Sequence, residues 1–229
     1  MHYLGYRLVQ FNNIKAIFFD LDGTLFETAP ELVGAINNML SDLKMPPLEN
    51  NQITNFIGRG ADNLIRKSIE LSSKKSSDDF FVDAIDAFHH HYGLVAHKSL
   101  PYEGVMETIK FIQNQDIKMA CITNKPSMFT DKIIDASGLT DFFDLVLSGD
   151  TLEKKKPDPL PVIYGCDYFN IKPIESIMVG DSINDIEAGH SAGAFVVTVP
   201  YGYQCGDSIV SPKVSLALSE FSELQCVLN

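Results

Sequence analysis

The sequence contains few cysteines and little positive charge. Its four cysteines are far apart and form no Cys-x-x-Cys pair, so neither a zinc site nor a disulfide framework is indicated. We interpret them as free thiols in a reducing compartment. Lysine and arginine number 18 against 30 aspartate and glutamate residues, a net charge of −12. This balance argues against a nucleic-acid partner, because proteins that bind nucleic acids gather basic side chains against the phosphates.

Long apolar runs are also absent. No stretch approaches the roughly 20 apolar residues of a membrane-spanning helix, and the N-terminus lacks the basic and apolar regions of a secretory signal. We therefore expect a cytoplasmic protein with no membrane partner, as a monomer or a homodimer. The 229 residues, 45% of them hydrophobic, suffice for one catalytic domain with a substantial insertion.

The order of apolar and polar segments predicts an α/β fold. Residues 14–20 form a short apolar run that ends in polar residues and glycine, typical of a parallel strand buried on both faces. Further strands are expected at residues 117–123, 145–148, 177–181 and 195–199. Helices are expected between them at residues 105–115, 128–137, 161–168 and 186–192. This alternation predicts a doubly wound parallel sheet of the Rossmann-like type.

The segment between the first strand and residue 101 has helical spacing instead. Apolar residues recur at helical intervals in residues 30–43, 61–71 and 79–92, and no convincing strand interrupts them. We predict an all-helical cap at residues 28–100, inserted into a catalytic core made of residues 1–27 and 101–229. Such a cap would close over a substrate and exclude water.

Polar clusters follow three of the expected strands, at residues 20–24, 123–125 and 180–185. Open α/β sheets bind ligands beyond the carboxyl ends of their strands. Asp20 and Asp22 are two positions apart, so both side chains can face one cleft, and Gly23 permits a sharp turn between strand and loop. Paired carboxylates suggest a nucleophile and an acid/base group.

Other side chains in these clusters suit phosphate chemistry. Asp181 and Asp185 would add carboxylates, which repel one another unless a cation neutralises them, and oxygen ligands of this kind suit Mg²⁺. Thr123 and Asn124 can donate hydrogen bonds to a phosphate or to a carboxylate. Lys156 is the candidate for neutralising phosphoryl oxygens, selected from three consecutive lysines because a proline follows it. A solvated basic loop is the alternative for this segment.

These motifs resemble those of the haloacid dehalogenase (HAD) superfamily, and they occur in the same order. They are DLDGTL at residues 20–25, ITN at 122–124, KP at 156–157 and GDSIND at 180–185. Within the superfamily the chain looks most like the phosphoglycolate phosphatases, through IGRGA at 57–61, NKP at 124–126, KKPDPLP at 155–161 and YGY at 201–203. The sequence FET at 26–28 departs from the hydrophobic-Asp-Ser pattern of relatives, at the hinge of the expected cap.

The resemblance implies a catalytic role for each matching carboxylate. Asp20 would form an aspartyl-phosphate, and Asp22 would protonate the leaving group and then deprotonate the hydrolytic water. Mg²⁺ would be held by the Asp20 carboxylate, the Asp22 backbone carbonyl and Asp181. Asp185 would support the metal site or position Lys156.

The resemblance also implies a substrate, for which 2-phosphoglycolate is the first candidate. Thr123 and Lys156 would bind the phosphoryl group, with Asn124 beside them. Arg59 lies between two glycines of the expected cap and could reach down to a substrate carboxylate. A helix-capping or surface role for Arg59 is an equal alternative.

Two other functions stay open at this point. The chain could be a phosphatase or a phosphomutase for a nucleotide or sugar phosphate, since a mutase uses the same aspartyl-phosphate. It could also be a non-enzymatic signalling module that is phosphorylated on Asp20. Such a module would need neither Asp22 as an acid nor a large cap after the phosphorylated residue.

Overall fold

The centre of the molecule is a six-stranded sheet in the order β5-β4-β1-β6-β7-β8, in which every neighbouring pair is parallel. The structure is a computed structural model that describes residues 10–74, 78, 80–203 and 211–228. The strands are β1 (Ala16–Phe19), β4 (Lys118–Ile122), β5 (Leu145–Leu147), β6 (Ser176–Gly180), β7 (Phe195–Thr198) and β8 (Leu216–Ala217). The predicted α/β class with a parallel sheet is confirmed.

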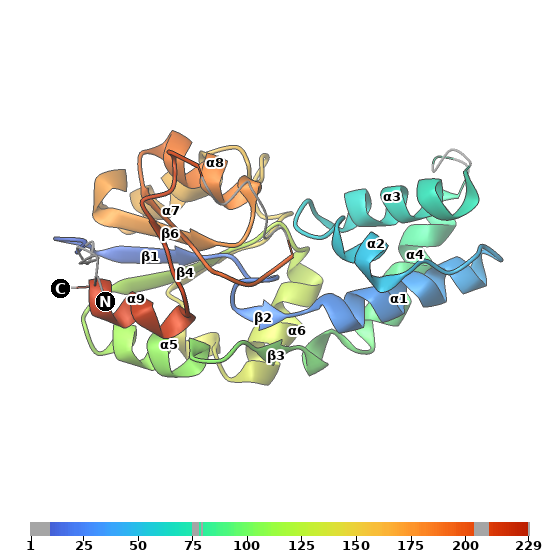
Figure 1. Cartoon of the computed structure of the whole chain (residues 1–229), viewed down its shortest axis with the longest axis horizontal. Helices are drawn as coiled ribbons and strands as arrows, with labels where there is room; N and C mark the ends of the chain where they lie inside the picture. Colours follow the sequence, from blue (N-terminus) through green and yellow to red (C-terminus); the bar gives the residue numbers. More distant parts are fainter. Residues whose placement is uncertain (1–9, 75–77, 79, 204–210, 229) are drawn as a thin grey trace, which may run out of the picture.

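Helices cover both faces of this sheet, as its central strand requires. Ala16 and Phe18 of β1 pack into one apolar cluster, and Ile17 and Phe19 pack into another on the opposite face, because successive side chains of a strand point to opposite sides. The covering helices are α5 (Val105–Gln113), α6 (Ser127–Ser137), α7 (Leu160–Tyr168), α8 (Ile183–Ala192) and α9 (Leu224–Val227). Figure 1 shows α7 and α8 on one side of the sheet and α5 and α9 on the other.

A helical unit lies beyond the carboxyl ends of the strands (Figure 1). It consists of α1 (Ala29–Asp42), α2 (Asn50–Thr54), α3 (Ala61–Ser73) and α4 (Phe81–Gly93). Helix α1 starts with Pro30 and Glu31 in its first turn, where a proline loses no hydrogen bond and an acid suits the helix dipole. Its buried stripe of Leu32, Ile36 and Met39 has the spacing of one helix face.

A two-stranded antiparallel ribbon joins the helical unit to the sheet. It pairs β2 (Phe26–Glu27) with β3 (Leu100–Pro101), so the chain enters and leaves the unit side by side. The sequence did not predict this ribbon, and it also missed α2, α9 and β8, because strands of two residues and helices of four or five residues are too short to show a period. Short 3₁₀ turns complete the fold at Ala96–Lys98, Thr140–Phe142, Pro173–Glu175 and Phe221–Glu223.

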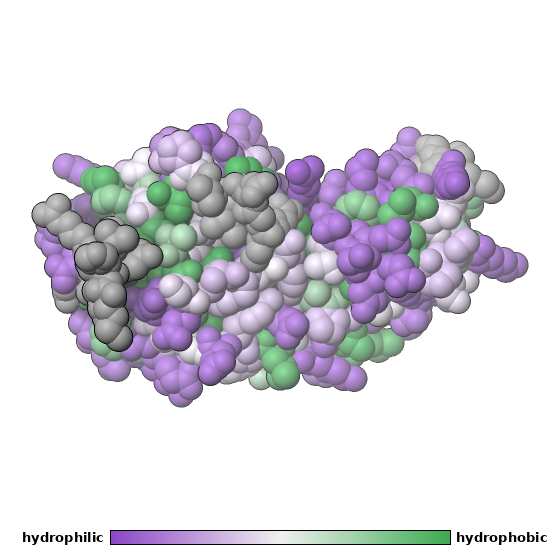
Figure 2. All heavy atoms as spheres, in the orientation of Figure 1, coloured by the Kyte–Doolittle hydropathy of each residue, from purple (hydrophilic) through white to green (hydrophobic). Residues whose placement is uncertain are grey.

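On the face in Figure 2 the helical unit has a largely hydrophilic surface, and the described cysteines are free. Among the helices that the structure describes, none combines the length and apolar character needed to cross a membrane. Cys121, Cys166 and Cys226 are free thiols, and Cys205 lies outside the described residues.

Candidate active site

The central strands bring the predicted polar clusters to one edge of the sheet. Asp20 directly follows β1, Thr123 follows β4 and Asp181 follows β6. The Asp20 N–H donates to the Val179 carbonyl and the Thr123 N–H donates to the Leu147 carbonyl, each at 2.9 Å. These two bonds continue the strand pairing into the loops, so the sheet itself positions Asp20 and Thr123.

Lys156 lies at the centre of the carboxylates. Its Nζ is 2.9 Å from Oδ1 of Asp20 and 2.6 Å from Oδ1 of Asp185, and it also donates to the Ile122 carbonyl. Lys156 is 2% exposed and Asp185 is 1% exposed. Full burial makes this pairing obligatory, because an unpaired charge at such a place would cost several kcal/mol.

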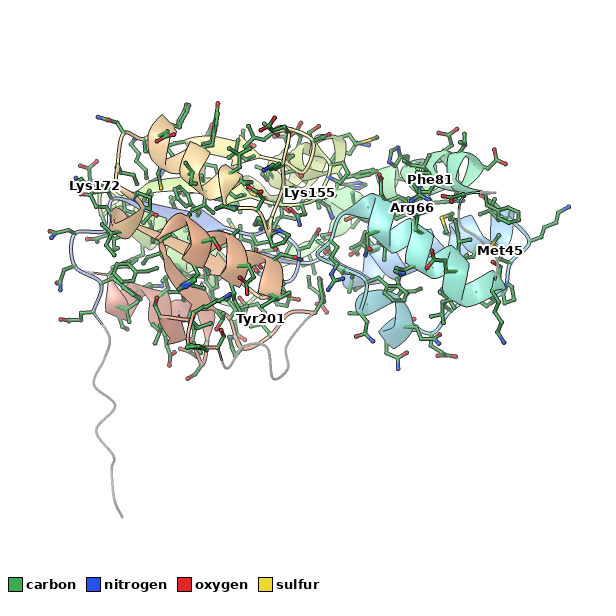
Figure 3. All side chains as sticks on the ribbon, turned by 90° about the horizontal axis from the view of Figure 1, so that it is seen from above. Met45, Arg66, Phe81, Lys155, Lys172 and Tyr201 are labelled. Carbon is green, nitrogen blue, oxygen red and sulfur yellow. The ribbon has the colours of Figure 1, made fainter. Side chains whose placement is uncertain are left out.

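The two preceding lysines lie elsewhere. Lys154 is an exposed partner of Asp158, at 3.2 Å. Lys155 lies at the junction between the sheet and the helical unit (Figure 3). Gly60 has a φ of +90°, and a Cβ built on it would lie 2.6 Å from Nζ of Lys155. Of the three lysines, Lys156 is thus the one that contacts the carboxylates of the site, and the positive φ of Gly60 is the feature that favours glycine at that position.

Three carboxylates next to Lys156 form a possible cation site. Oxygen atoms of Asp20, Asp181 and Asp185 lie within 4.8 Å of one another. Asp185 is already occupied, because its second oxygen accepts from the N–H of Ser182 at 3.0 Å and from the Ser182 hydroxyl at 2.7 Å. Ser182 and Asp185 form the capping box of α8, so the start of that helix fixes this carboxylate. Asp20 and Asp181 are the more available ligands, since within the described part of the chain each has one oxygen bonded, to Lys156 and to the Tyr203 N–H respectively.

The pKa values of these groups show that the site lacks positive charge. Burial raises the pKa of Asp20 to about 7, against the opposing effect of Lys156 and with a further increase from Asp185. Burial also raises the pKa of Asp181 well above its usual range, with added repulsion from Asp185 and Asp20. A divalent cation that prefers oxygen ligands would relieve this repulsion. The donor set therefore fits Mg²⁺.

Tyr203 connects this cluster to the beginning of the helical unit. Its backbone N–H donates to Oδ2 of Asp181 at 2.7 Å. Its hydroxyl oxygen accepts from the N–H of Thr28 at 2.5 Å and from the N–H of Ala29 at 2.9 Å. N–H groups at the start of a helix such as α1 have no acceptor within the helix itself. No such role was predicted from the sequence for the YGY motif at residues 201–203.

The carboxylate of Asp22 points away from the cation cluster. Both its oxygens accept from Nζ of Lys125, at 2.7 and 2.9 Å. Lys125 is 4% exposed, and its Nζ lies 4.8 Å from the ring centre of Tyr92 on α4. No function was predicted for Lys125 from the sequence. Its position after Thr123 and Asn124, in the same polar cluster, was the signal that could have identified it.

The side chain of Asn124 is bonded to two backbone carbonyls of the protein. Its amide nitrogen donates to the Gly58 carbonyl at 3.0 Å and to the Lys156 carbonyl at 2.8 Å, so both its donors are engaged within the protein. The amide nitrogen of Asn184 donates to the same Gly58 carbonyl at 3.1 Å. In this arrangement, Asn124 fastens the loop between α2 and α3 to the sheet and has no donor left for a substrate.

Arg59 has an exposed side chain. It lines a hollow together with Lys155, Lys156, Asn184 and Glu187. The cavity above Asp20 is lined by Gly58 and Gly60 but not by Arg59. The structure therefore does not bring Arg59 to the carboxylates, and its exposed position corresponds to the surface alternative.

The cavity above Asp20 has a polar floor and an apolar roof. Asp20, Asp22, Thr123 and Lys125 supply the floor from the strand ends. The helical unit supplies the roof, through Leu32, Ile57, Leu64, Phe88 and Tyr92. An enclosed polar site beneath apolar walls is suited to chemistry on a small charged substrate.

Comparison with known proteins identifies the family. Residues 17–199 match the haloacid dehalogenase-like hydrolases, and the chain belongs to this family, which confirms the resemblance of its motifs. It is 39% identical over 212 residues to the phosphoglycolate phosphatase of Thiobacillus denitrificans, covering 92% of this chain and 93% of the relative. It is 39% identical over 199 residues to the phosphoglycolate phosphatase of Nitrosospira multiformis, covering 86% and 87%.

A solved structure gives the same result for the fold. The crystal structure of a predicted phosphoglycolate phosphatase from Haemophilus somnus superposes with a TM-score of 0.89 at 33% identity, covering 94% of this chain and 98% of the other. The similarity extends over both the sheet and the helical unit, because it includes nearly the whole of each chain.

Proposed function

We propose that this protein is a Mg²⁺-dependent, cytoplasmic phosphatase that hydrolyses 2-phosphoglycolate to glycolate and phosphate through an aspartyl-phosphate. One observation carries the proposal: Asp20 lies at the floor of a cavity, in contact with a buried lysine and close to the other carboxylates of a cation site. The names of the relatives that match nearly the full length of the chain support this choice of substrate.

The residues of the floor divide the reaction between them. An oxygen of Asp20 forms a bond to phosphorus while the bond to the ester oxygen breaks, and Asp22 gives a proton to the departing alkoxide. Asp22 then takes a proton from the water that attacks the aspartyl-phosphate, which restores Asp20 and releases phosphate. Lys156 and the Thr123 hydroxyl bind the phosphoryl oxygens throughout.

The metal adds neutralising charge at the same place. Mg²⁺ would be held by the Asp20 carboxylate, the Asp22 backbone carbonyl and Asp181, and when bound it offsets the negative charge of the phosphoryl group. Asp185 is a positioning residue in this proposal, since one oxygen is bonded to Lys156 and the other to Ser182.

The helical unit acts as the cap of this enzyme. We assign the cap to residues 28–100 and the catalytic core to residues 1–27 and 101–229. The ribbon of β2 and β3 lies at the boundary and provides a narrow hinge, because strands of two residues contribute few hydrogen bonds. The apolar roof would exclude bulk water while the aspartyl-phosphate exists.

The test is a phosphate-release assay with Mg²⁺ across 2-phosphoglycolate, nucleotides and sugar phosphates, with Asp20→Asn as the matched blank. Asn keeps the size of the side chain but is a poor nucleophile, so we expect a loss of about 10³-fold or more in kcat. Equal phosphate release by the blank and the unaltered protein would refute the mechanism. An isomeric product without phosphate would instead identify a phosphomutase.

A further inference from the structure

Lys125 is the one basic side chain among the described residues that line the cavity. Its Nζ is bonded to both oxygens of Asp22, and its side chain is 3% exposed. The other cations of the region are placed differently. Lys156 is bonded to Asp20 and Asp185 and is not among the residues that line this cavity, and Arg59 is exposed outside it.

The position of Lys125 coincides with the place of the leaving group. In the proposed reaction, Asp22 protonates the ester oxygen, so the departing alcohol must lie against the carboxylate that Lys125 contacts. The walls next to this position are apolar, with Tyr92, Phe88 and Phe129 among them. An anionic leaving group in such surroundings needs a nearby counter-ion, because an unpaired buried charge is strongly disfavoured.

We propose that Lys125 determines the specificity for the leaving group, by exchanging its bonds to Asp22 for bonds to a carboxylate of the substrate. The inference rests on the proposed function and deepens it by naming the residue that would recognise the carboxylate of the leaving group. A neutral alcohol offers Lys125 no anion, so the ammonium stays on Asp22. In this proposal Lys125, at the edge of the sheet, binds the substrate carboxylate, which is the role that the sequence suggested for Arg59.

A pair of substrates tests this role directly. 2-Phosphoglycolate and 2-hydroxyethyl phosphate are alike in length and differ in the carboxylate. We expect the unaltered protein to favour 2-phosphoglycolate by roughly 10- to 100-fold in kcat/KM, the contribution of one charge-assisted pair. Lys125→Met should remove this preference, and Arg59→Met, the matched control, should keep it.

The outcomes separate the two proposals. An equal loss for both substrates in Lys125→Met, or no preference in the unaltered protein, would overturn the role of Lys125 while leaving the phosphatase intact. Absence of phosphate release from every ester by the unaltered protein would overturn the proposed function itself.

A second variant guards against misfolding of Lys125→Met. Asp22→Asn keeps Lys125 and removes its internal carboxylate, so glycolate should bind this variant about 10-fold more tightly than it binds the unaltered protein. Calorimetric titration with glycolate measures the change, ethylene glycol is the neutral control ligand, and thermal unfolding checks that the variant is folded. Unchanged or weaker glycolate binding by Asp22→Asn would contradict the exchange.

Discussion

Asp20 and Asp181 are buried carboxyl groups that share a small space with one ammonium group. Both have a raised pKa, so in the metal-free protein they retain protons at a pH where the unfolded chain has released them. Stability then falls as pH rises, since the native state binds more protons than the unfolded state. For Asp20 this loss occurs between its ordinary pKa of 3.8 and about 7.

Bound metal should oppose this loss of stability with rising pH, because Mg²⁺ binds ionised carboxylates. We expect the thermal midpoint in EDTA to fall between pH 5 and pH 7.5, and added Mg²⁺ to raise it more at pH 7.5 than at pH 5. Differential scanning fluorimetry across this range measures both effects. Asp181→Asn is the control and should remove most of the Mg²⁺ increment. An increment that is the same at both pH values would contradict the assignment of the cation site.

Residue types at strand ends made much of this site predictable. Asp20, Asp181 and Lys156 belong to motifs that a sequence displays directly, and the structure brings them together. Lys125 escaped prediction because its partner, Asp22, is 103 residues away in the chain, and a lysine beside a strand end has many possible partners. The hydrogen-bonding role of the Gly58 carbonyl was not predicted, because every residue has a backbone oxygen and the residue type does not show which one is used.

The loop between α2 and α3 is the element that fastens the cap to the core. Its Gly58 carbonyl accepts from Asn124 and from Asn184, one residue from each of two strand-end clusters. The backbone at Gly58 and Gly60 has φ values of +99° and +90°, which residues with a side chain rarely adopt. This loop geometry turns the carbonyl toward the core.

Removing one of these hydrogen bonds should loosen the closed arrangement. Asn184→Ala should lower kcat/KM for 2-phosphoglycolate by roughly 2- to 10-fold, the value of one hydrogen bond, and should increase amide hydrogen exchange in residues 57–61. Asn51→Ala, at an exposed site on α2, is the control and should change neither. Unaltered exchange in residues 57–61 of Asn184→Ala would show that the bond does not hold the loop.

The elements themselves were predictable in proportion to their length. The stripe of apolar residues placed α1 at 30–43, within one residue of its observed bounds at each end. Helix α8 starts three residues earlier than expected, at Ile183, because the capping box of Ser182 and Asp185 begins it, and this signal is independent of apolar spacing. The hinge ribbon of β2 and β3 has two residues in each strand, too few for any pattern.

In the molecule as a whole, one apolar cluster extends from the sheet into the helical unit. Phe129 of α6 is a link in it, with its ring centre 4.8 Å from that of Tyr92 and 6.1 Å from that of Phe88, both on α4. The opposite face of the sheet has its own cluster, which includes Val162 of α7. Among the described residues, the helical unit therefore packs into the apolar cluster on one face of the sheet and not into the cluster on the other.

Substitutions on the two faces should have separable effects. Phe129→Ala should lower the free energy of unfolding by about 3 to 5 kcal/mol and also reduce kcat/KM, because it removes packing beneath the cavity roof. Val162→Ala should cost about 2 kcal/mol and leave kcat/KM unchanged. Denaturant unfolding and steady-state assays measure the two quantities. A Phe129→Ala enzyme with full activity would show that this packing does not maintain the site.

Tyr203 couples the candidate cation site to the start of the helical unit. The same residue bonds a candidate metal ligand through its backbone and the first turn of α1 through its hydroxyl. Anything that shifts α1 therefore changes how firmly Asp181 is held, and the reverse also applies. By thermodynamic reciprocity, the factor by which bound metal favours one position of the cap equals the factor by which that position strengthens metal binding. In the proposed enzyme, a bound cation would thus act on the position of the helical unit as well as on the chemistry.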